Sequence, residues 1–510
     1  MLAPAIKSIR RGIEKESLRV RPDGSLAATA HPAGLGSPLT HPRITTDFSE
    51  AQLELITGVH DRVDACLEEL TQIHQVVYRH IGDELLWGTS MPCNLPADDA
   101  IPIARYGGSN IGRAKTVYRM GLAQRYGRRM QTISGIHYNF SLAGMDWPAL
   151  GWPGGANEAY FALIRNFRRH AWLLLYLLGA SPAACSSFVA ADAHGLQPFG
   201  PGTLFLPHAT SLRMGPLGYQ SQAQAALAVS YNSLEAYAAS LHEALSTPHP
   251  PYESIGIREG DDYRQLSTSL LQIENEFYGK IRPKRVIRRG ERPLHALRER
   301  GVEYVEVRLI DLDPFSPIGI TARTIRLLDV FLLHCLLSES PPDTPGEIAA
   351  IARNQNLVAL RGREPGLRLE RGQGTVPLVE WGAEVLAECG PLAAALDAGE
   401  GSAHADALSY AQAALADAAS LPSARVLEEM EREHGRSHIR FALAHSLQHR
   451  AAVASMPLSS EVEQRFARMA QESLVEQRAI ESADTVPFEA YRAAYLSPDR
   501  LTTSPRGEGR

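Results

Sequence analysis

The stretch VEYVEVRLI, residues 302–310, alternates apolar and polar side chains with the period of two that predicts a β-strand. Its apolar face would consist of Val305, Val307 and Leu309. Glu306 and Arg308 would project together from the opposite face. Taken alone, an acid and a guanidinium on the polar face of a strand are most simply a surface ion pair. Other segments favour a second interpretation, in which this face lines a binding site.

A second strand with one polar face is predicted in QTISGIHYNF, residues 131–140. Alternation places on one face the residues Gln131, Ile133, Gly135, His137 and Asn139. Since Gly135 lacks a side chain, a ligand or an ion could lie against this face between Ile133 and His137. A single histidine is more often structural, so His137 becomes a candidate ligand only together with groups from other strands.

Two N-terminal segments offer carboxylates from largely apolar, extended sequence. Glu14 and Glu16 lie two residues apart in RGIEKESLRV, so both point to the same side of an extended chain. In ITTDFSEAQLELITG, Asp47 precedes Glu50 and Glu54. Acids side by side are either exposed to water or neutralised by a cation. Four such segments together predict a site for hard divalent cations such as Mg²⁺, which could bridge phosphate oxygens.

Length and charge limit the classes of function. A chain of 510 residues with 44% hydrophobic and 21% charged residues can bury a substantial core and is no small binding module. The 51 basic and 57 acidic residues give a net charge of −6, which disfavours a protein that mainly binds nucleic acid or anionic membrane. The basic run at residues 282–292 is therefore interpreted as an electropositive rim for anionic substrates, with an RNA-binding or scaffolding role as the rival hypothesis. Neither a Walker A motif nor a GxGxxG motif after a strand is present.

The texture of the sequence changes near residue 320. Before this point predicted strands and helices are mixed, whereas after it apolar residues recur at three- and four-residue spacing, which predicts helices. We therefore expect a mixed α and β part that carries the sites over residues 1–320. A mainly helical part packed on it is expected over 321–496, and a disordered tail over 497–510.

Cysteine usage and hydropathy favour the cytoplasm. The cysteines are odd in number, far apart and without a CxxC pair, so reduced thiols are expected at Cys66, Cys93, Cys185, Cys335 and Cys389. The uncharged stretch at residues 171–191 is broken by the sequence GASP at 179–182, which predicts a buried helix and not a membrane span. The first residues lack the apolar core of a secretory signal.

Strings spread over most of the chain carry a family resemblance. They include RGIEKESLRV, ITTDFSEAQLELITG, QTISGIHYNF, LQIENEFY, IRPKR and GVEYVEVR. From about Arg11 to Gly366 the chain closely resembles the bacterial glutamate–cysteine ligases of the proteobacterial type. The resemblance reappears in ADTVPFEAY, residues 483–491.

The resemblance implies an α+β fold in which a largely antiparallel sheet, of the glutamine synthetase-like carboxylate–amine ligase type, forms the active site and is surrounded by helices. It implies ATP-dependent ligation of the γ-carboxylate of L-glutamate to L-cysteine through γ-glutamyl phosphate, the first step of glutathione biosynthesis. ATP would be a co-substrate, with two or three Mg²⁺ ions, or Mn²⁺ in their place. The alternative is another ligase of this scaffold with a different amine acceptor. We expect a cytoplasmic monomer without nucleic-acid or membrane partners.

The resemblance also assigns residue roles. The implied metal ligands are Glu14, Glu16, Asp47, Glu54, His137 and Glu306. The implied glutamate-binding residues are Gln131, Ile133, Asn139, Arg213 and Arg308. The implied cysteine pocket consists of Phe48, Tyr118, Arg119, Leu122, Tyr219 and Tyr278. Catalytic roles would fall on Arg308, Glu306 and His137.

Overall fold

A computed structural model describes residues 8–189, 195–218, 222–225, 227–399 and 401–501. Its centre is a seven-stranded sheet in which every pair of neighbouring strands is antiparallel. The main path follows the order β11 (Ile281–Lys284), β12 (Tyr304–Asp311), β5 (Gly135–Leu142), β1 (Ile9–Val20), β3 (Gln52–Ile56) and β2 (Ile44–Thr46). The short strand β4 (Leu85–Leu86) also pairs with β1. The predicted combination of helices with an antiparallel sheet is confirmed.

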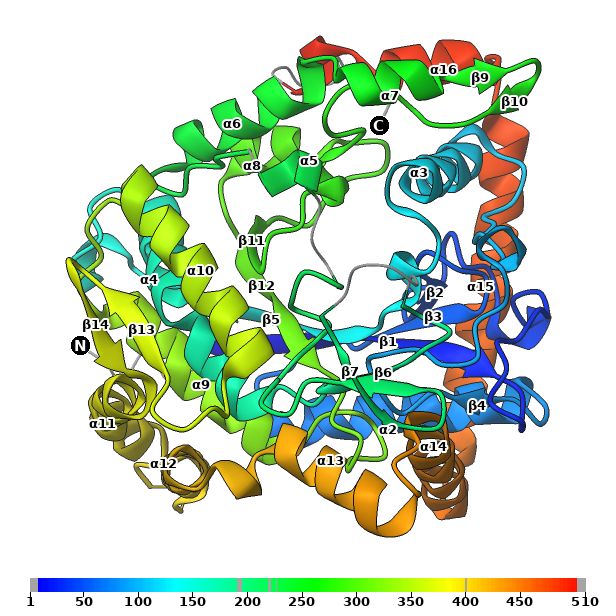
Figure 1. Cartoon of the computed structure of the whole chain (residues 1–510). Helices are drawn as coiled ribbons and strands as arrows, with labels where there is room; N and C mark the ends of the chain where they lie inside the picture. The colour runs from blue at the N-terminus through cyan, green and yellow to red at the C-terminus, as the bar shows by residue number, and fades with distance from the viewer. Residues whose placement is uncertain (1–7, 190–194, 219–221, 226, 400, 502–510) are drawn as a thin grey trace.

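Helices cover one face of this sheet. The helices of the first part are α2 (Val63–His80), α3 (Asn110–Tyr126), α4 (Gly155–Leu178), α6 (Leu234–Ser246), α7 (Pro250–Ile255) and α8 (Pro293–Arg300), and α9 (Ala322–Leu337) opens the second part. Figure 1 shows α2 below the sheet and α4 and α9 to its left. Tyr138 on β5 donates a hydrogen bond to Asp329 on α9 at 2.6 Å, and Lys15 on β1 contacts His74 on α2 at 2.9 Å. The apolar side chains of the strands therefore face α2, α4 and α9, which leaves the opposite face for polar groups.

The predicted strands agree with the structure except at one end. The strand around Glu306 and Arg308 spans Tyr304–Asp311, close to its predicted bounds. The strand predicted from residue 131 begins only at Gly135, because Met130–Thr132 forms a 3-10 helix (η3). The Thr132 hydroxyl donates to the carbonyl of Arg129 at 2.7 Å and stabilises this turn. Gln131 and Ile133 consequently do not lie on the strand face that carries His137.

The chain after residue 321 is mainly helical. After α9, its helices are α10 (Pro345–Arg361), α11 (Leu378–Leu396), α12 (Ala403–Ala416), α13 (Pro422–Glu433), α14 (His438–Ser455), α15 (Ser460–Ala483) and α16 (Phe488–Leu496). A hairpin of β13 (Arg368–Arg371) and β14 (Gly374–Pro377) interrupts them. Side-chain caps begin several helices, with Ser109 for α3, Thr321 for α9 and Ser459 for α15. One hydrophobic cluster contains residues from both sides of position 320, so the two parts share a core.

Three further features bear on the sequence-based predictions. α4 is a buried helix that ends at Leu178, as expected for residues 171–178, and no helix in the described part of the chain is long and apolar enough to span a bilayer. Pro498–Leu501 forms a short 3-10 helix (η7) with Leu501 buried, which differs from the disorder expected from 497 onward. Residues 502–510 lie outside the described residues.

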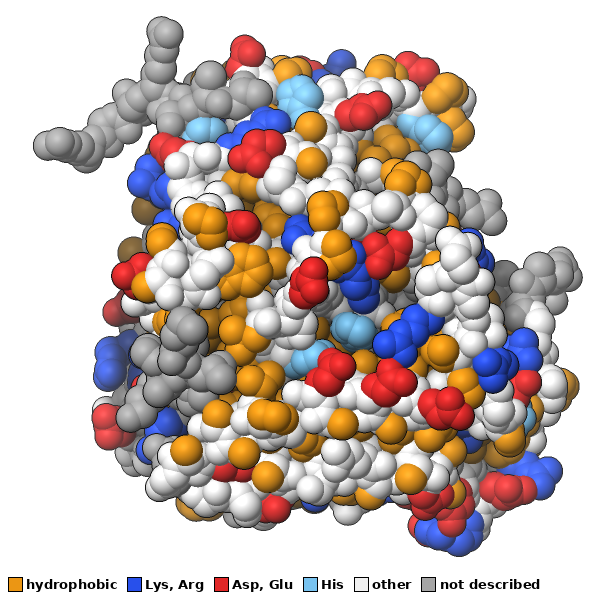
Figure 2. Space-filling model, turned by 90° about the vertical axis from the view of Figure 1, so that its left-hand side faces the viewer, with side chains coloured by type: hydrophobic (Ala, Val, Ile, Leu, Met, Phe, Trp, Pro, Cys, Tyr) orange, Lys and Arg blue, Asp and Glu red, His pale blue; other side chains and the backbone are white. Residues whose placement is uncertain are grey.

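On the face shown in Figure 2, acidic and basic side chains are intermixed, in keeping with the small net charge.

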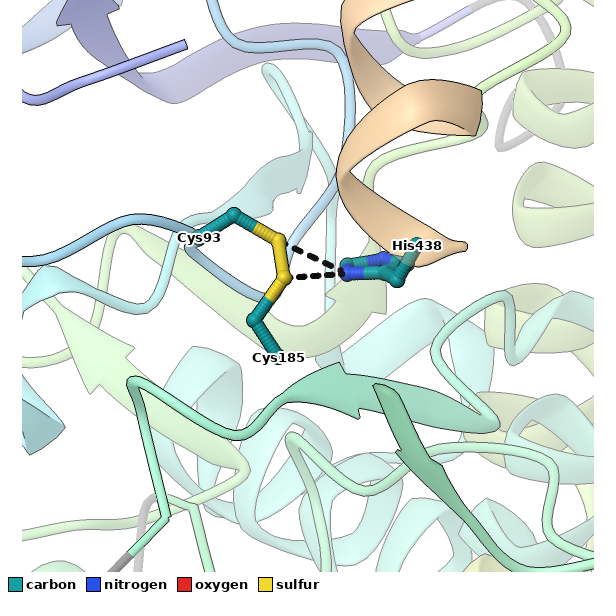
Figure 3. A group of neighbouring side chains, drawn as sticks. All are labelled: Cys93, Cys185 and His438. Carbon is teal, nitrogen blue, oxygen red and sulfur yellow. Dashed lines mark hydrogen bonds between the residues drawn. A yellow bond between two sulfur atoms is a disulfide. The ribbon is translucent and has the colours of Figure 1, made fainter. Parts of the chain in front are cut away.

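The expectation of five reduced thiols is wrong for two of them. Cys93, in the loop after β4, and Cys185, at the end of β6 (Ala183–Cys185), form a disulfide (Figure 3). The Nδ1 atom of His438, the first residue of α14, lies 3.2 Å from the sulfur of Cys93. The two cysteines are 92 residues apart in sequence, and only the tertiary fold brings their Cα atoms to 5.2 Å. The free cysteines of the described residues, Cys66, Cys335 and Cys389, are buried.

Candidate active site

The polar face of the sheet gathers predicted acids from three strands, β1, β3 and β12, and His137 from a fourth, β5. The antiparallel register pairs Glu14 on β1 with His137 on β5, and Glu16 on β1 with Glu54 on β3. On the other side of β5, Glu306 on β12 pairs with Asn139. Because alternate side chains of a strand share a face, these groups from distant parts of the sequence converge on one surface.

The central contacts join His137 to the two acids of β1. The His137 Nδ1 atom lies 3.2 Å from Glu14 Oε2, and Nε2 lies 3.5 Å from Glu16 Oε1. One oxygen each of Glu14 and Glu54 and one nitrogen of His137 lie within 4.8 Å of one another. Asn139 Nδ2 donates to the second oxygen of Glu14 at 2.9 Å. Carboxylate oxygens and an imidazole at this spacing form a donor set that suits a divalent cation such as Mg²⁺ or Mn²⁺.

The pKa values of these acids show an imbalance of charge. Burial, followed by the nearby Glu14 and Asp47, raises the pKa of Glu54 well above its usual value. Burial also raises the pKa of Glu16. Burial acts in the same direction on Glu306, but Lys284 and Arg308 outweigh it and hold the pKa of Glu306 well below its usual value. The basic side chains therefore compensate Glu306, while the acids around Glu54 still favour an added cation.

Basic side chains border the acids on the β12 side. Arg308 Nη1 lies 3.2 Å from Glu306 and 3.3 Å from His137 Nδ1, and Lys284 Nζ lies 3.0 Å from Glu306. From the basic run at residues 282–292, Arg282 and Lys284 line the cavity described below. The Arg285, Arg288 and Arg292 side chains of this run instead lie beside acids, at 3.5, 3.9 and 2.6 Å.

The space beside Gly135, where the sequence suggested that a ligand or an ion could lie, is filled by a side chain of the protein. The guanidinium of Arg213 occupies the space where a Cβ atom of residue 135 would stand. Arg213 is almost fully buried, and its Nη2 atom donates to the carbonyl of Arg308 at 2.9 Å. The backbone N–H of Gly135 donates to Glu16 at 2.8 Å. The missing side chain thus makes room for an arginine of the protein and not for a ligand.

A cavity of about 330 Å³ lies over this polar face, a volume within the usual range for small-molecule sites. The acidic side is lined by Glu14, Asp47, Glu54 and Glu306, with His137 and Arg308 beside them. The same cavity is lined by the predicted cysteine-pocket residues Phe48, Tyr118, Arg119, Leu122 and Tyr278. The remaining member of that set, Tyr219, lies outside the described residues.

The residues predicted to bind glutamate are divided by the structure. Gln131 lines the cavity and its amide donates to the Tyr278 hydroxyl at 2.9 Å. Arg213 and Arg308 line a small adjoining cavity together with His137. The Ile133 side chain is fully buried in a hydrophobic cluster, and Asn139 lines another cavity, on the far side of Glu14. The structure therefore does not bring the side chain of Ile133 to this site.

Several cavity residues were missed by sequence reasoning. Lys115 lies on the face of α3 that carries Tyr118, and burial lowers the pKa of Lys115 to about 8. Tyr491 and Tyr495 reach the cavity from α16, which is far from β12 (Tyr304–Asp311) in sequence. A signal for Tyr491 existed, since it ends the family-like string ADTVPFEAY. Lys115 follows the glycine-rich run at residues 107–112, which was interpreted as a plain turn, and Tyr495 stood in no pattern that distinguished it from an ordinary helix face.

Comparison with known proteins gives a consistent result. The family model for glutamate-cysteine ligase matches residues 2–358. The chain is 48% identical to the glutamate–cysteine ligase of Pseudomonas putida strain W619 and 46% identical to that of Alcanivorax borkumensis. These matches cover 96% and 97% of the chain and 95% and 97% of the relatives.

Solved structures give the same picture. The crystal structure of glutamate–cysteine ligase from Francisella tularensis in complex with AMP matches with a TM-score of 0.92 and 36% identity, over 96% of this chain and 97% of that one. A bifunctional glutathione synthetase from Pasteurella multocida matches with a TM-score of 0.72 and 25% identity, over 92% of this chain and 57% of that one.

Proposed function

The chain belongs to the glutamate–cysteine ligase family and catalyses ATP-dependent formation of γ-glutamylcysteine, and we propose that the cavity over the polar face of the sheet is where this reaction occurs. The observation that carries the proposal is the register that places Glu14, Glu54, Glu306 and His137 around one cavity beside Arg308. We further propose that the sheet is of the glutamine synthetase-like type and that the protein is a cytoplasmic monomer.

The acids that line the cavity, with His137 and the buried Glu16 behind it, would hold two or three Mg²⁺ ions, or Mn²⁺ in their place. The ligands would be Glu14, Glu16, Asp47, Glu54, His137 and Glu306. When bound, such ions neutralise charge on the phosphate oxygens of ATP. The close triad of Glu14, Glu54 and His137 supports this assignment, as does the pKa of Glu54, which burial and the neighbouring acids raise well above its usual value.

The reaction has two displacements. An oxygen of the glutamate γ-carboxylate attacks the terminal phosphorus of ATP, which gives γ-glutamyl phosphate and ADP. The cysteine amine then attacks the γ-carbonyl carbon, phosphate leaves, and the amine loses a proton. Arg308 would donate hydrogen bonds to the transferred phosphoryl group, and His137 would keep the carboxylate of Glu14 in place.

Arg213 would hold the backbone of Arg308 in position through a hydrogen bond to its carbonyl. Its guanidinium lies under the strand end at Gly135, donates to the Arg308 carbonyl and lies 3.6 Å from Asp311. Asp311 in turn accepts hydrogen bonds from the hydroxyls of Ser181 and Ser211 at 2.7 and 3.0 Å. A fully buried network of this kind holds β12 in register, and with it the polar pair Glu306 and Arg308.

We propose that ATP occupies the cavity of about 560 Å³ on the other side of Glu14. Glu14 lines both this cavity and the one that holds the acids, so a nucleotide here could direct its phosphates toward the metal ligands. Trp147 and Tyr304 supply aromatic surface for a base, and Arg10 adds positive charge. The AMP complex of the Francisella tularensis relative supports a nucleotide site in this fold.

The requirement for both amino acids tests the proposed activity. Phosphate release from ATP is expected to need Mg²⁺, L-glutamate and L-cysteine together, with a γ-linked dipeptide as product. Initial rates with each candidate amine in turn, and mass spectrometry of the product, measure this. Equal turnover with ammonia in place of cysteine would favour a ligase of the same scaffold with another acceptor.

The nucleotide placement predicts a selective effect of Trp147→Ala. We expect the KM for ATP to rise about fivefold or more, because stacking of a base on an aromatic ring contributes about 1–3 kcal/mol. The KM values for glutamate and cysteine should stay within about twofold. Trp152→Ala is the matched control, since Trp152 follows closely in the chain but does not line this cavity. A rise in the KM for cysteine alone would contradict the placement.

A further inference from the structure

The helix α16, near the end of the chain, forms part of the wall of the active-site cavity, although it is far in sequence from the strands that carry the acids. In Figure 1, α15 runs along the right-hand side of the molecule and α16 lies at the top, above α3. Tyr491 and Tyr495 of α16 are one turn apart, with parallel rings whose centroids are 5.9 Å from each other. Both line the cavity whose other end is formed by Glu14 and Glu306.

Hydrogen bonds join the segment before α16 to the start of α3. Asn110, the first residue of α3, donates from its side chain to the carbonyl of Val486 at 2.9 Å and from its backbone to the carboxylate of Asp484 at 2.5 Å. The guanidinium of Arg113 lies 4.5 Å from the ring of Phe488, which is buried. These contacts hold α16 against the helix that carries Tyr118 and Arg119.

The end of α16 is fastened to the opposite wall. Arg292 donates to the carbonyl of Tyr495 at 2.9 Å and lies 4.9 Å from the centre of its ring. The same arginine forms a buried ion pair with Glu274 at 2.6 Å. Glu274 begins the short 3-10 helix η5 (Glu274–Glu276), which leads to Tyr278. The two tyrosines of α16 are thus held between two of the segments that supply the predicted cysteine pocket, α3 and the segment of Tyr278.

We propose that Tyr491 and Tyr495 form the outer wall of the acceptor end of the cavity and set the size of the amine substrate that the enzyme accepts. This inference rests on the proposed placement of cysteine beside Tyr118 and Tyr278. Two stacked aromatic rings one helical turn apart make a bulky, largely apolar wall, which suits a small thiol side chain and leaves less room for a longer one. The wall also excludes water from the end of the cavity where the amine attacks.

The test compares acceptor preference in variants of the wall. In Tyr491→Ala and Tyr495→Ala, we expect the KM for cysteine to rise at least about fivefold. Relative to cysteine, kcat/KM for the longer acceptors homocysteine and norvaline should rise at least about fivefold. The KM values for ATP and glutamate should stay within about twofold. Tyr491→Trp, which enlarges the wall, should act in the opposite direction on the longer acceptors and so tests the idea in a variant that removes no packing.

Two control variants distinguish a failure of the proposed wall from a failure of the proposed cysteine placement. Tyr410→Ala alters an exposed tyrosine on α12, outside the cavity, and should keep wild-type constants. Tyr118→Ala alters the proposed cysteine pocket directly and should raise the KM for cysteine. If Tyr118→Ala has this effect while every variant at 491 and 495 keeps the wild-type acceptor preference, the wall is refuted and the cysteine placement stands. If Tyr118→Ala also leaves the KM for cysteine unchanged, the placement itself fails and the wall fails with it.

Discussion

Glu14→Gln is expected to lower kcat by at least about a hundredfold. The Glu14 carboxylate accepts from Asn139 at 2.9 Å, lies 3.2 Å from His137 and lines both cavities. An amide removes one negative charge and turns one oxygen acceptor into a donor, which would confront the Asn139 amide. Loss of a carboxylate from a cation site weakens metal binding, and a hundredfold loss of rate corresponds to about 2.7 kcal/mol. Phosphate release measured over a series of Mg²⁺ concentrations should also show a higher requirement for Mg²⁺.

Glu50→Gln is the matched control for this prediction. Glu50 lies between Asp47 and Glu54 in sequence, but its carboxylate accepts hydrogen bonds from the backbone of His31 and Arg105, at 2.9 Å each. It therefore supports a loop, and its variant should keep the kcat and the Mg²⁺ dependence of the wild type. An equal loss of kcat in both variants would mean that the Glu14 substitution acts by destabilising the fold. Circular dichroism of the two proteins would detect such a loss of folded structure.

Arg308→Lys is expected to lower kcat at least about tenfold although it keeps the positive charge. The planar guanidinium of Arg308 contacts Glu306 and His137 at 3.2 and 3.3 Å. An ammonium cannot hold two such partners and also donate to phosphoryl oxygens with the same fixed geometry. The KM for ATP should change less than kcat, because the contact is strongest while the phosphoryl group moves.

Arg371→Lys provides the comparison for Arg308→Lys. Arg371 forms an exposed ion pair with Glu384 far from the cavity, and exposed pairs contribute little. In steady-state kinetics, Arg371→Lys should therefore keep the kcat of the wild type, whereas Arg308→Lys should not. Wild-type kinetics in Arg308→Lys would return Arg308 to the simpler interpretation of an ion pair beside Glu306.

The sequence by itself determined which side chains share a face where the chain is extended, but not that the strand of His137 begins only at Gly135. Alternation with a period of two is a local property of an extended chain, so Glu306 and Arg308 could be assigned to one side without knowledge of their neighbours. Spacing of three and four residues likewise predicted the helical texture after residue 321. The family-like strings identified the family and hence the reaction, which the comparisons confirm.

Only the tertiary structure decided how these local patterns combine. The register of β1 with β3 and β5 sets which acids meet, and it depends on packing between residues as far apart in sequence as Ile9 and Leu142. The same reason explains the errors. Nothing near Gly135 in sequence reveals that Arg213 fills the space beside it, and nothing near Cys93 reveals Cys185. Contacts of this kind arise when distant elements are packed together to bury apolar surface, and α16 lines the cavity for this reason although no local pattern of its sequence requires it.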